Sequence, residues 1–252
     1  MFARARAVYL ATRKKHDQLF NRYVMRPIAA LVVVGLARTP ATPNQITILN
    51  LAIFVGAAVL FVALPGFAGG LVAVGVLELS YLFDCADGML ARHKQLASKQ
   101  GHLFDFFTDE IKAVLLAGAL GLRAWRAGGY GLDLAEWPAG APGFLVGAVA
   151  AVAIIASATS LTNFLRHPEI AGRETPVEAH YETVARERAR TLPALAVEGV
   201  TTFLKFLNHY PSHIWLWAAV GRLDLFFWLY AAINLLYLGR GWLGLLWRFG
   251  RR

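Results

Sequence analysis

The chain has 252 residues, of which 57% are hydrophobic and only 16% are charged. An ordinary soluble domain has about 25% charged residues. So few charged side chains cannot coat a soluble fold of this hydrophobicity, and the composition favours an integral membrane protein.

The formal net charge of +9 indicates an anionic partner. The basic residues flank apolar segments and do not gather in one polar domain, so we expect membrane lipid and an anionic substrate as partners, and no nucleic acid. The single cysteine, Cys85, excludes an intrachain disulfide.

The N-terminal segment is basic, and we predict an interfacial amphipathic helix over residues 2–24, lying against anionic lipid. The apolar run that follows, Ile28 to Leu36, is short and lacks a small-residue cleavage site. A signal peptide is therefore not expected.

A helix that crosses a bilayer needs about 20 mostly apolar residues. The sequence predicts six such spans, over residues 46–64, 71–90, 103–122, 144–165, 195–220 and 223–238. Lys205, Asn208, His209 and Pro211 interrupt the fifth, which is either one kinked helix or an interfacial helix followed by a short span. The predicted fold class is all-α, as one membrane-embedded domain over residues 1–252.

The distribution of positive charge predicts the orientation of the six spans. Twenty Lys and Arg residues lie on the side of the two termini, and three (Arg123, Arg126 and Arg222) lie on the other. We therefore expect both termini in the cytoplasm, in a cell inner membrane.

Four aspartates lie at the cytoplasmic ends of the second and third spans. Asp84 and Asp87 are three residues apart, and Asp105 and Asp109 are four apart, so each pair shares one helix face. The short loop between these spans makes them antiparallel neighbours, and the four carboxylates can converge.

Converging carboxylates in a low dielectric either take up protons or bind cations. Divalent ions such as Mg²⁺ prefer oxygen ligands, and two ions held by shared carboxylates suit displacement at phosphorus. Helix capping is an alternative role for a single aspartate near the end of a span. It does not account for four aspartates on matched helix faces. A cation-coupled transporter is the alternative function, but it predicts acids near the middle of the bilayer and often internal repeats.

Small and basic residues accompany the acids. Gly88 lies one turn after Asp84 and leaves room for a ligand near the backbone, while Gly101 lies one turn before Asp105. Arg92, two turns after Asp84, either pairs with a phosphate oxygen or extends to lipid headgroups.

The stretch from Asp84 to Asp109 reads DCADGMLARHKQLASKQGHLFDFFTD. It resembles the signature of the CDP-alcohol phosphotransferase family, D-x2-D-G-x2-A-R-x8-G-x3-D-x3-D. All eight specified positions match: Asp84, Asp87, Gly88, Ala91, Arg92, Gly101, Asp105 and Asp109. Upstream, TPNQIT at residues 42–47 is similar to the opening of the family's first span.

The resemblance implies a transferase of phospholipid synthesis that moves a substituted phosphoryl group from a CDP-alcohol to an acceptor alcohol and releases CMP. It implies two Mg²⁺ or Mn²⁺ ions held by the four aspartates, with Asp109 also acting as general base. It places the CDP-linked donor at Thr42, Pro43, Asn44, Gln45, Thr47, Gly88, Arg92 and Ser98. A homodimer is among the partners we consider.

The sequence leaves both substrates open. The donor is expected to be CDP-diacylglycerol used with a soluble alcohol, although a soluble CDP-alcohol used with a lipid alcohol is the alternative. For the acceptor, family members that use an inositol phosphate have a basic cluster after the fourth span. Only Arg166 stands at a comparable place here, so it is the expected acceptor contact.

Overall fold

The computed structural model describes residues 1–14, 17–126, 142–166 and 192–249. Within these residues every regular element is helical, as predicted. In chain order the elements are α1 (Phe2–Thr12), η1 (Asn21–Met25), α2 (Arg26–Leu36), α3 (Pro43–Ala63), α4 (Gly66–His93), α5 (Lys99–Arg126), α6 (Pro142–Arg166), α9 (Leu192–Asn208), η2 (Tyr210–Ser212), α10 (Ile214–Ala219) and α11 (Leu223–Phe249).

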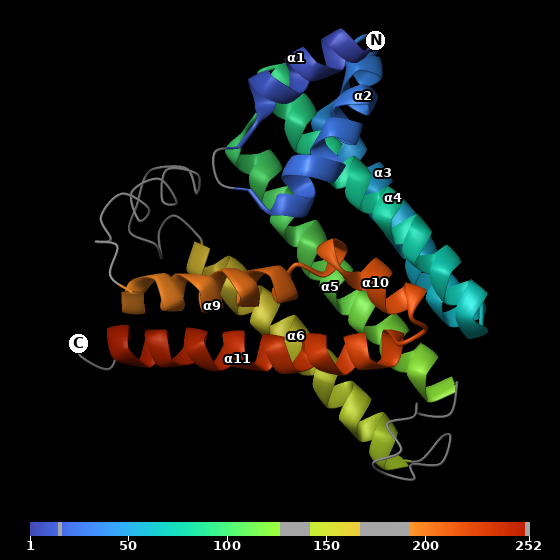
Figure 1. Ribbon diagram of the computed structural model, residues 1–252, viewed down its shortest axis with the longest axis vertical. Helices are drawn as coiled ribbons and strands as arrows, with labels where there is room; N and C mark the ends of the chain where they lie inside the picture. Colours follow the sequence, from blue (N-terminus) through green and yellow to red (C-terminus); the bar gives the residue numbers. More distant parts are fainter. Residues whose placement is uncertain (15–16, 127–141, 167–191, 250–252) are drawn as a thin grey trace.

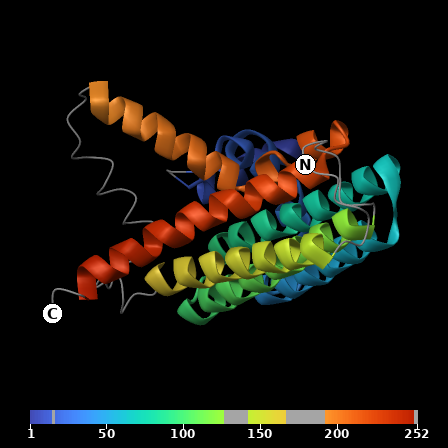
Figure 2. The same ribbon diagram turned by 90° about the horizontal axis from the view of Figure 1, so that it is seen from below.

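The long helices form one bundle. Helix α3 packs against α4 and α5, α5 packs against α6, and α6 packs against α11. Figures 1 and 2 show α5 beside α6, with the N-terminal helices gathered at one end of α4.

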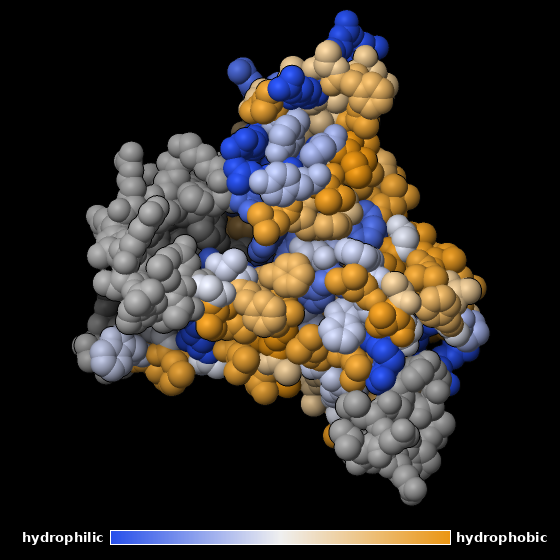
Figure 3. Space-filling view, in the orientation of Figure 1, coloured by the Kyte–Doolittle hydropathy of each residue, from blue (hydrophilic) through white to orange (hydrophobic). Residues whose placement is uncertain are grey.

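Four helices in the described part of the chain are long and apolar enough to cross a membrane. They are α3, α4, Phe144–Leu165 of α6 and Leu223–Trp247 of α11. Many of their large apolar side chains are exposed, among them Val59, Val72 and Val146. Figure 3 shows apolar residues along the right flank of the molecule, beside hydrophilic ones over the N-terminal helices. This pattern supports an integral membrane protein.

The helices at the third and fifth predicted spans are not among the four that are long and apolar enough to cross a membrane. Helix α5 is as long as α4, but it carries the acidic pair and Lys112. The fifth is divided into α9, which has 17 residues, the short turn η2 and α10, which has six. Pro211 lies in η2, where it has no backbone N–H to continue a helix. The predicted interruption of this segment is confirmed.

The single N-terminal helix predicted over residues 2–24 is wrong. Helix α1 ends at Thr12, and Arg13 has an extended backbone, with φ −65° and ψ 133°. Asp17 then accepts a hydrogen bond from the backbone N–H of Gln18 and forms an ion pair with Arg26. These contacts start a second helical segment, which includes η1 and continues directly into α2.

Two hydrophobic cores meet along α4. The larger core joins α3, α4, α5, α6, α10 and α11 and includes Leu77 of α4. The smaller core joins α1, α2 and the later turns of α4, where Cys85 and Met89 are buried. Asp84 lies between these two stretches of α4, so its carboxylate is placed where the cores separate.

A buried arginine closes the bundle at the end away from the aspartates. Arg123 of α5 donates from Nη1 to the carbonyls of Phe61 and Leu64 and from Nη2 to the carbonyl of Gly66. The last carbonyls of a helix have no partner within the helix. Arg123 therefore satisfies the C-terminus of α3 and the turn into α4.

Replacing Arg123 by methionine is expected to lower the free energy of unfolding by about 3 kcal/mol, since buried carbonyls lose their donors. Denaturant unfolding in detergent micelles measures this. Arg126→Met is the matched control, because Arg126 donates to the carbonyl of Val62 from an exposed position. Its expected loss is about 0.5 kcal/mol. Equal losses for the two variants would contradict a special role for Arg123.

Candidate active site

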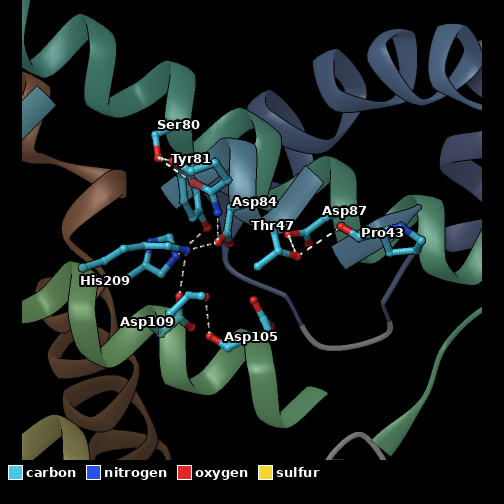
Figure 4. A network of polar contacts seen from close by, with 12 residues as sticks. Pro43, Thr47, Ser80, Tyr81, Asp84, Asp87, Asp105, Asp109 and His209 are labelled. Carbon is cyan, nitrogen blue, oxygen red and sulfur yellow. Dashed lines mark hydrogen bonds and ion pairs between the residues drawn. The ribbon is translucent and has the colours of Figure 1, made fainter. Parts of the chain in front are cut away.

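Three aspartates from two helices converge. One carboxylate oxygen each of Asp84 on α4 and of Asp105 and Asp109 on α5 lie within 4.8 Å of one another. Figure 4 shows their side chains directed into the space between the two helices. The i, i+4 spacing on α5 and the antiparallel arrangement predicted for the pair bring these groups together.

The fourth aspartate, Asp87, is buried beside this group and does not belong to the set within 4.8 Å. Its Oδ2 accepts a hydrogen bond of 2.7 Å from Oγ1 of Thr47 on α3. The same hydroxyl lies 3.2 Å from the carbonyl of Pro43. Thr47 thus fixes Asp87 to the first turns of α3 (Figure 4).

A lysine and an asparagine complete the polar cluster. The Nζ atom of Lys112 lies 2.5 Å from Oδ1 of Asp84 and 3.0 Å from Oδ1 of Asp109. Nδ2 of Asn50, on α3, donates to the same oxygen of Asp84 at 2.9 Å. Ser80 in turn donates to Oδ1 of Asn50 at 2.5 Å, which fixes the orientation of the amide.

The donor set fits a hard divalent cation. Asp84, Asp105 and Asp109 offer carboxylate oxygens alone, which Mg²⁺ and Mn²⁺ prefer over nitrogen or sulfur ligands. Oδ2 of Asp84 is on the other side of its carboxylate from the oxygen that Lys112 and Asn50 contact. The three residues can therefore hold an ion together.

Thr47→Val is expected to lower the rate of any reaction at this cluster by about tenfold. Valine keeps the shape of threonine but gives Asp87 no donor, and loss of a partner that orients a ligand typically costs 10- to 100-fold. Initial rates at saturating metal measure the effect. The matched control is Thr12→Val, since that buried hydroxyl donates to the carbonyl of Val8 in its own helix. An unchanged rate for Thr47→Val would show that Asp87 needs no orientation by Thr47.

The residues expected at the donor site begin α3. Thr42 is the N-cap of this helix, and it forms a capping box with Gln45 in which each side chain bonds to the other's backbone N–H. Pro43 occupies the first turn, and Asn44 is exposed. The side chains of Thr42 and Gln45 therefore stabilise the helix start next to Thr47.

Ser98 and Gly101 bring the start of α5 close to the start of α3. Oγ of Ser98 accepts a hydrogen bond of 3.0 Å from the backbone N–H of Gly101. A Cβ atom at Gly101 would lie 3.1 Å from that oxygen and 3.2 Å from Oδ1 of Asn44. A side chain at this position would therefore require Asn44 and Ser98 to shift by a few tenths of an ångström.

Arg92 contacts the N-terminal helix. Its Nε donates to the carbonyl of Thr12, the last residue of α1, at 3.1 Å. A Cβ atom at Gly88 would contact the Arg92 guanidinium at 3.7 Å. The structure thus places Gly88 and Arg92 together and holds α1 against the end of α4 that carries the aspartates.

A directed chain of hydrogen bonds lies beside Asp84. Oη of Tyr81 donates to Oδ1 of Asn21 at 2.6 Å, so Tyr81 accepts from Nε2 of His209 at 2.8 Å. Nδ1 of His209 then accepts from Oγ of Ser212 at 2.6 Å. This chain connects η1, α4 and η2, which are far apart in the sequence.

A cavity of about 280 Å³ adjoins the carboxylates. Asp84, Asp109 and Lys112 form part of its wall. Other wall residues carry hydroxyl, amide or imidazole groups: Ser80, Tyr81, Thr159, Thr162, Asn163, Asn208, His209, Tyr210, Tyr230, Asn234 and Tyr237. A small polar molecule in this cavity would lie directly against Asp109.

The expected acceptor contact, Arg166, is the last residue of α6, and its side chain lies outside the described residues. The wall of the cavity near that end of α6 consists of Thr159, Thr162 and Asn163. Asn163 donates to Oε1 of Glu110 at 2.9 Å.

Sequence reasoning missed Asn50, Tyr81 and His209 as parts of the site. A signal existed for two of them. Asn50 is a polar residue in an apolar span, one turn after Thr47, and Tyr81 lies one turn before Asp84. The position of His209 beside Tyr81 depends on how the α9–η2 segment folds back, which no sequence spacing shows.

Comparison with known proteins agrees with these features. The family model described as CDP-alcohol phosphatidyltransferase matches residues 40–220. None of the curated proteins matches the chain. Because the family match covers most of the chain and includes the whole acidic cluster, the chain belongs to the CDP-alcohol phosphatidyltransferase family. Membership supports a membrane transferase that acts on a CDP-alcohol and an acceptor alcohol in phospholipid synthesis.

Proposed function

We propose that this protein transfers a substituted phosphoryl group from a CDP-alcohol, with CDP-diacylglycerol as the expected donor, to an acceptor alcohol and releases CMP. One observation supports this most directly. Asp84 and Asp109 belong both to the group of converging carboxylates and to the wall of the polar cavity. A donor phosphate held at the carboxylates would therefore face an acceptor held in the cavity.

Asp109 is the proposed general base. Its side chain is 49% exposed, and it lies where the cavity meets the carboxylates. It would take the proton of the acceptor hydroxyl as that oxygen forms a bond to the phosphorus that carries the donor alcohol. The bond from this phosphorus to the bridging oxygen breaks, and CMP leaves with the electron pair.

Asp84, Asp87, Asp105 and Asp109 are the proposed ligands of two Mg²⁺ or Mn²⁺ ions. When bound, the ions neutralise charge on the phosphoryl oxygens and on the leaving CMP. Asp84 and Asp87 on α4 and Asp105 and Asp109 on α5 would hold the donor in line with the acceptor, and such positioning supplies much of the rate.

The donor site is proposed at the starts of α3 and α5. Thr42, Pro43, Asn44, Gln45 and Thr47 would line the cytidine end, with Ser98 beside Asn44 across Gly101. Gly88 and Arg92 would contact the donor phosphates, and the Arg92 guanidinium already lies against Gly88. Arg166 remains the proposed acceptor contact at the end of α6.

For the membrane arrangement we propose six spans, with α5 and the α9–α10 segment added to the four apolar helices. Both termini and the aspartates would face the cytoplasm, with the protein in the cell inner membrane as one domain, and as a homodimer. Cysteine labelling from each side of the membrane tests the orientation, in a Cys85→Ala background.

The decisive experiment incubates the purified protein with CDP-diacylglycerol and a panel of alcohols, with and without Mg²⁺ or Mn²⁺, and measures CMP. A second arm offers soluble CDP-alcohols to a lipid alcohol. We expect CMP release only when donor, acceptor and metal are all present. No CMP in either arm, combined with cation uptake into proteoliposomes, would replace the transferase by the transporter.

A further inference from the structure

Lys112 lies inside the carboxylate cluster. The residue is 3% exposed, and its ammonium contacts Asp84 of the neighbouring helix at 2.5 Å and Asp109 of its own helix at 3.0 Å. Both partners belong to the three aspartates whose oxygens converge. A positive charge of this chain is thus already bound to two of the three groups that would hold a metal ion.

The lysine stands outside the matched signature, which ends three residues earlier at Asp109. It is one helical turn beyond that aspartate, on the same face of α5. Its contact with Asp84 bridges α5 to α4, which is also what an ion shared by Asp84 and Asp109 would do. The ammonium and such an ion therefore need the same two carboxylates.

The Lys112 ammonium and a bound divalent ion repel each other. A divalent ion bound to Asp84 or Asp109 would lie within a few ångströms of the ammonium. Because the lysine is buried, water screens its charge less than that of a surface side chain, although the Asp109 side chain is half exposed. Without the ion, the ammonium neutralises two carboxylates that would otherwise repel each other in a low dielectric. The same side chain thus favours the metal-free protein and disfavours metal binding.

We propose that Lys112 is a resident cation of the carboxylate cluster, which competes with divalent ions for Asp84 and Asp109. The metal affinity of the cluster is held down by this competition, so that the ion that contacts these two aspartates binds weakly and exchanges readily. This inference rests on the proposed metal-dependent transfer, and it concerns a residue to which the transfer itself assigns no role.

The test measures binding of Mn²⁺ without substrate, through the electron paramagnetic resonance signal of the free ion. The purified protein in detergent micelles is compared with Lys112→Met, Lys112→Arg and Lys99→Met. Lys112→Met keeps much of the side-chain length but removes the charge, and it is expected to bind Mn²⁺ at least tenfold more tightly than the wild type. Lys112→Arg keeps the charge, and its affinity is expected to stay within threefold of the wild type or to fall.

Lys99→Met is the matched control, since Lys99 is an exposed residue on the same helix. It lies 13 residues before Lys112, about 20 Å along the axis. Its loss removes the same charge, but the expected change in Mn²⁺ affinity is less than threefold. A similar gain in Lys99→Met would show a general charge effect and overturn the proposal.

Thermal unfolding provides a second readout. A ligand that binds only the folded protein stabilises it by RT ln(1 + [L]/Kd), so tighter binding gives more stabilisation at the same ligand concentration. Added Mn²⁺ should therefore raise the melting temperature of Lys112→Met more than that of the wild type. Recovery of Lys112→Met only in the presence of Mn²⁺ would also support the proposal. Failure of this variant to fold even with Mn²⁺ would overturn it, since the ion could then not replace the ammonium.

The failures of the two proposals are distinguishable. If the wild type and Lys112→Met bind Mn²⁺ equally, Lys112 only joins α4 to α5, and the proposed transfer still stands. If neither protein binds Mn²⁺ at millimolar concentration, the metal site is wrong, and both the competition and the metal-dependent transfer fail.

Discussion

Replacing Asp109 by asparagine is expected to lower CMP release by about 10³-fold, while the protein still folds and binds the CDP-alcohol. Asparagine has nearly the same shape, but it cannot take the proton of the acceptor hydroxyl, and general base catalysis typically contributes 10²- to 10⁴-fold. Rates of CMP release and donor binding by calorimetry measure the two effects separately.

The neighbouring acid provides the control for this variant. Glu110 accepts a hydrogen bond from Asn163 and is not among the three converging aspartates. Glu110→Gln makes the same chemical change one residue later, and CMP release is expected to stay within about threefold. Full turnover by Asp109→Asn would show that another group, or water, removes the proton.

Removal of divalent ions is expected to reduce CMP release to the uncatalysed background. The acidic cluster offers oxygen ligands only, and without bound ions its negative charge would repel the diphosphate of the donor. The protein is treated with a chelator, dialysed into metal-free buffer and assayed before and after addition of Mg²⁺ or Mn²⁺. Activity should return with the added ion.

A residue-level comparison shows whether the ions act at this cluster. Asp105→Asn is expected to raise the metal concentration that gives half-maximal activity by at least tenfold, because it removes one of the three converging carboxylates. Asp224→Asn, which alters a carboxylate paired with Arg222 at the start of α11, should leave that concentration unchanged. Persistent activity after chelation would contradict a metal requirement.

The local sequence predicted the acidic site well because it lies on two consecutive helices. The spacing of Asp84 and of the pair Asp105 and Asp109 determines helix faces, and the short loop makes the two helices run in opposite directions, each packed against α3. The convergence of these three oxygens confirms that reasoning. Asp87 shows the limit of prediction from local sequence, because its hydrogen bond to Thr47 depends on how α3 packs against α4.

The N-terminal helix shows a different limit. Composition alone favours one basic amphipathic helix over residues 2–24, yet α1 ends at Thr12. The ion pair between Asp17 and Arg26 stabilises the start of the second helical segment, and the bond from Arg92 to the carbonyl of Thr12 holds the end of α1 against α4. The packing of α1 against α4 is a tertiary property that the composition of this segment does not show.

By itself, the sequence determined the membrane class, the helical architecture, the family signature and the face of each helix that carries the aspartates. These properties follow from hydropathy and from spacing within one or two helices, which are local quantities. Only the tertiary structure decided that Lys112 occupies the carboxylate cluster, that Asn50 and Thr47 orient two of its acids, and that a polar cavity adjoins Asp109. The physical reason is that each of these contacts joins helices whose relative depth and rotation are set by packing of the whole bundle.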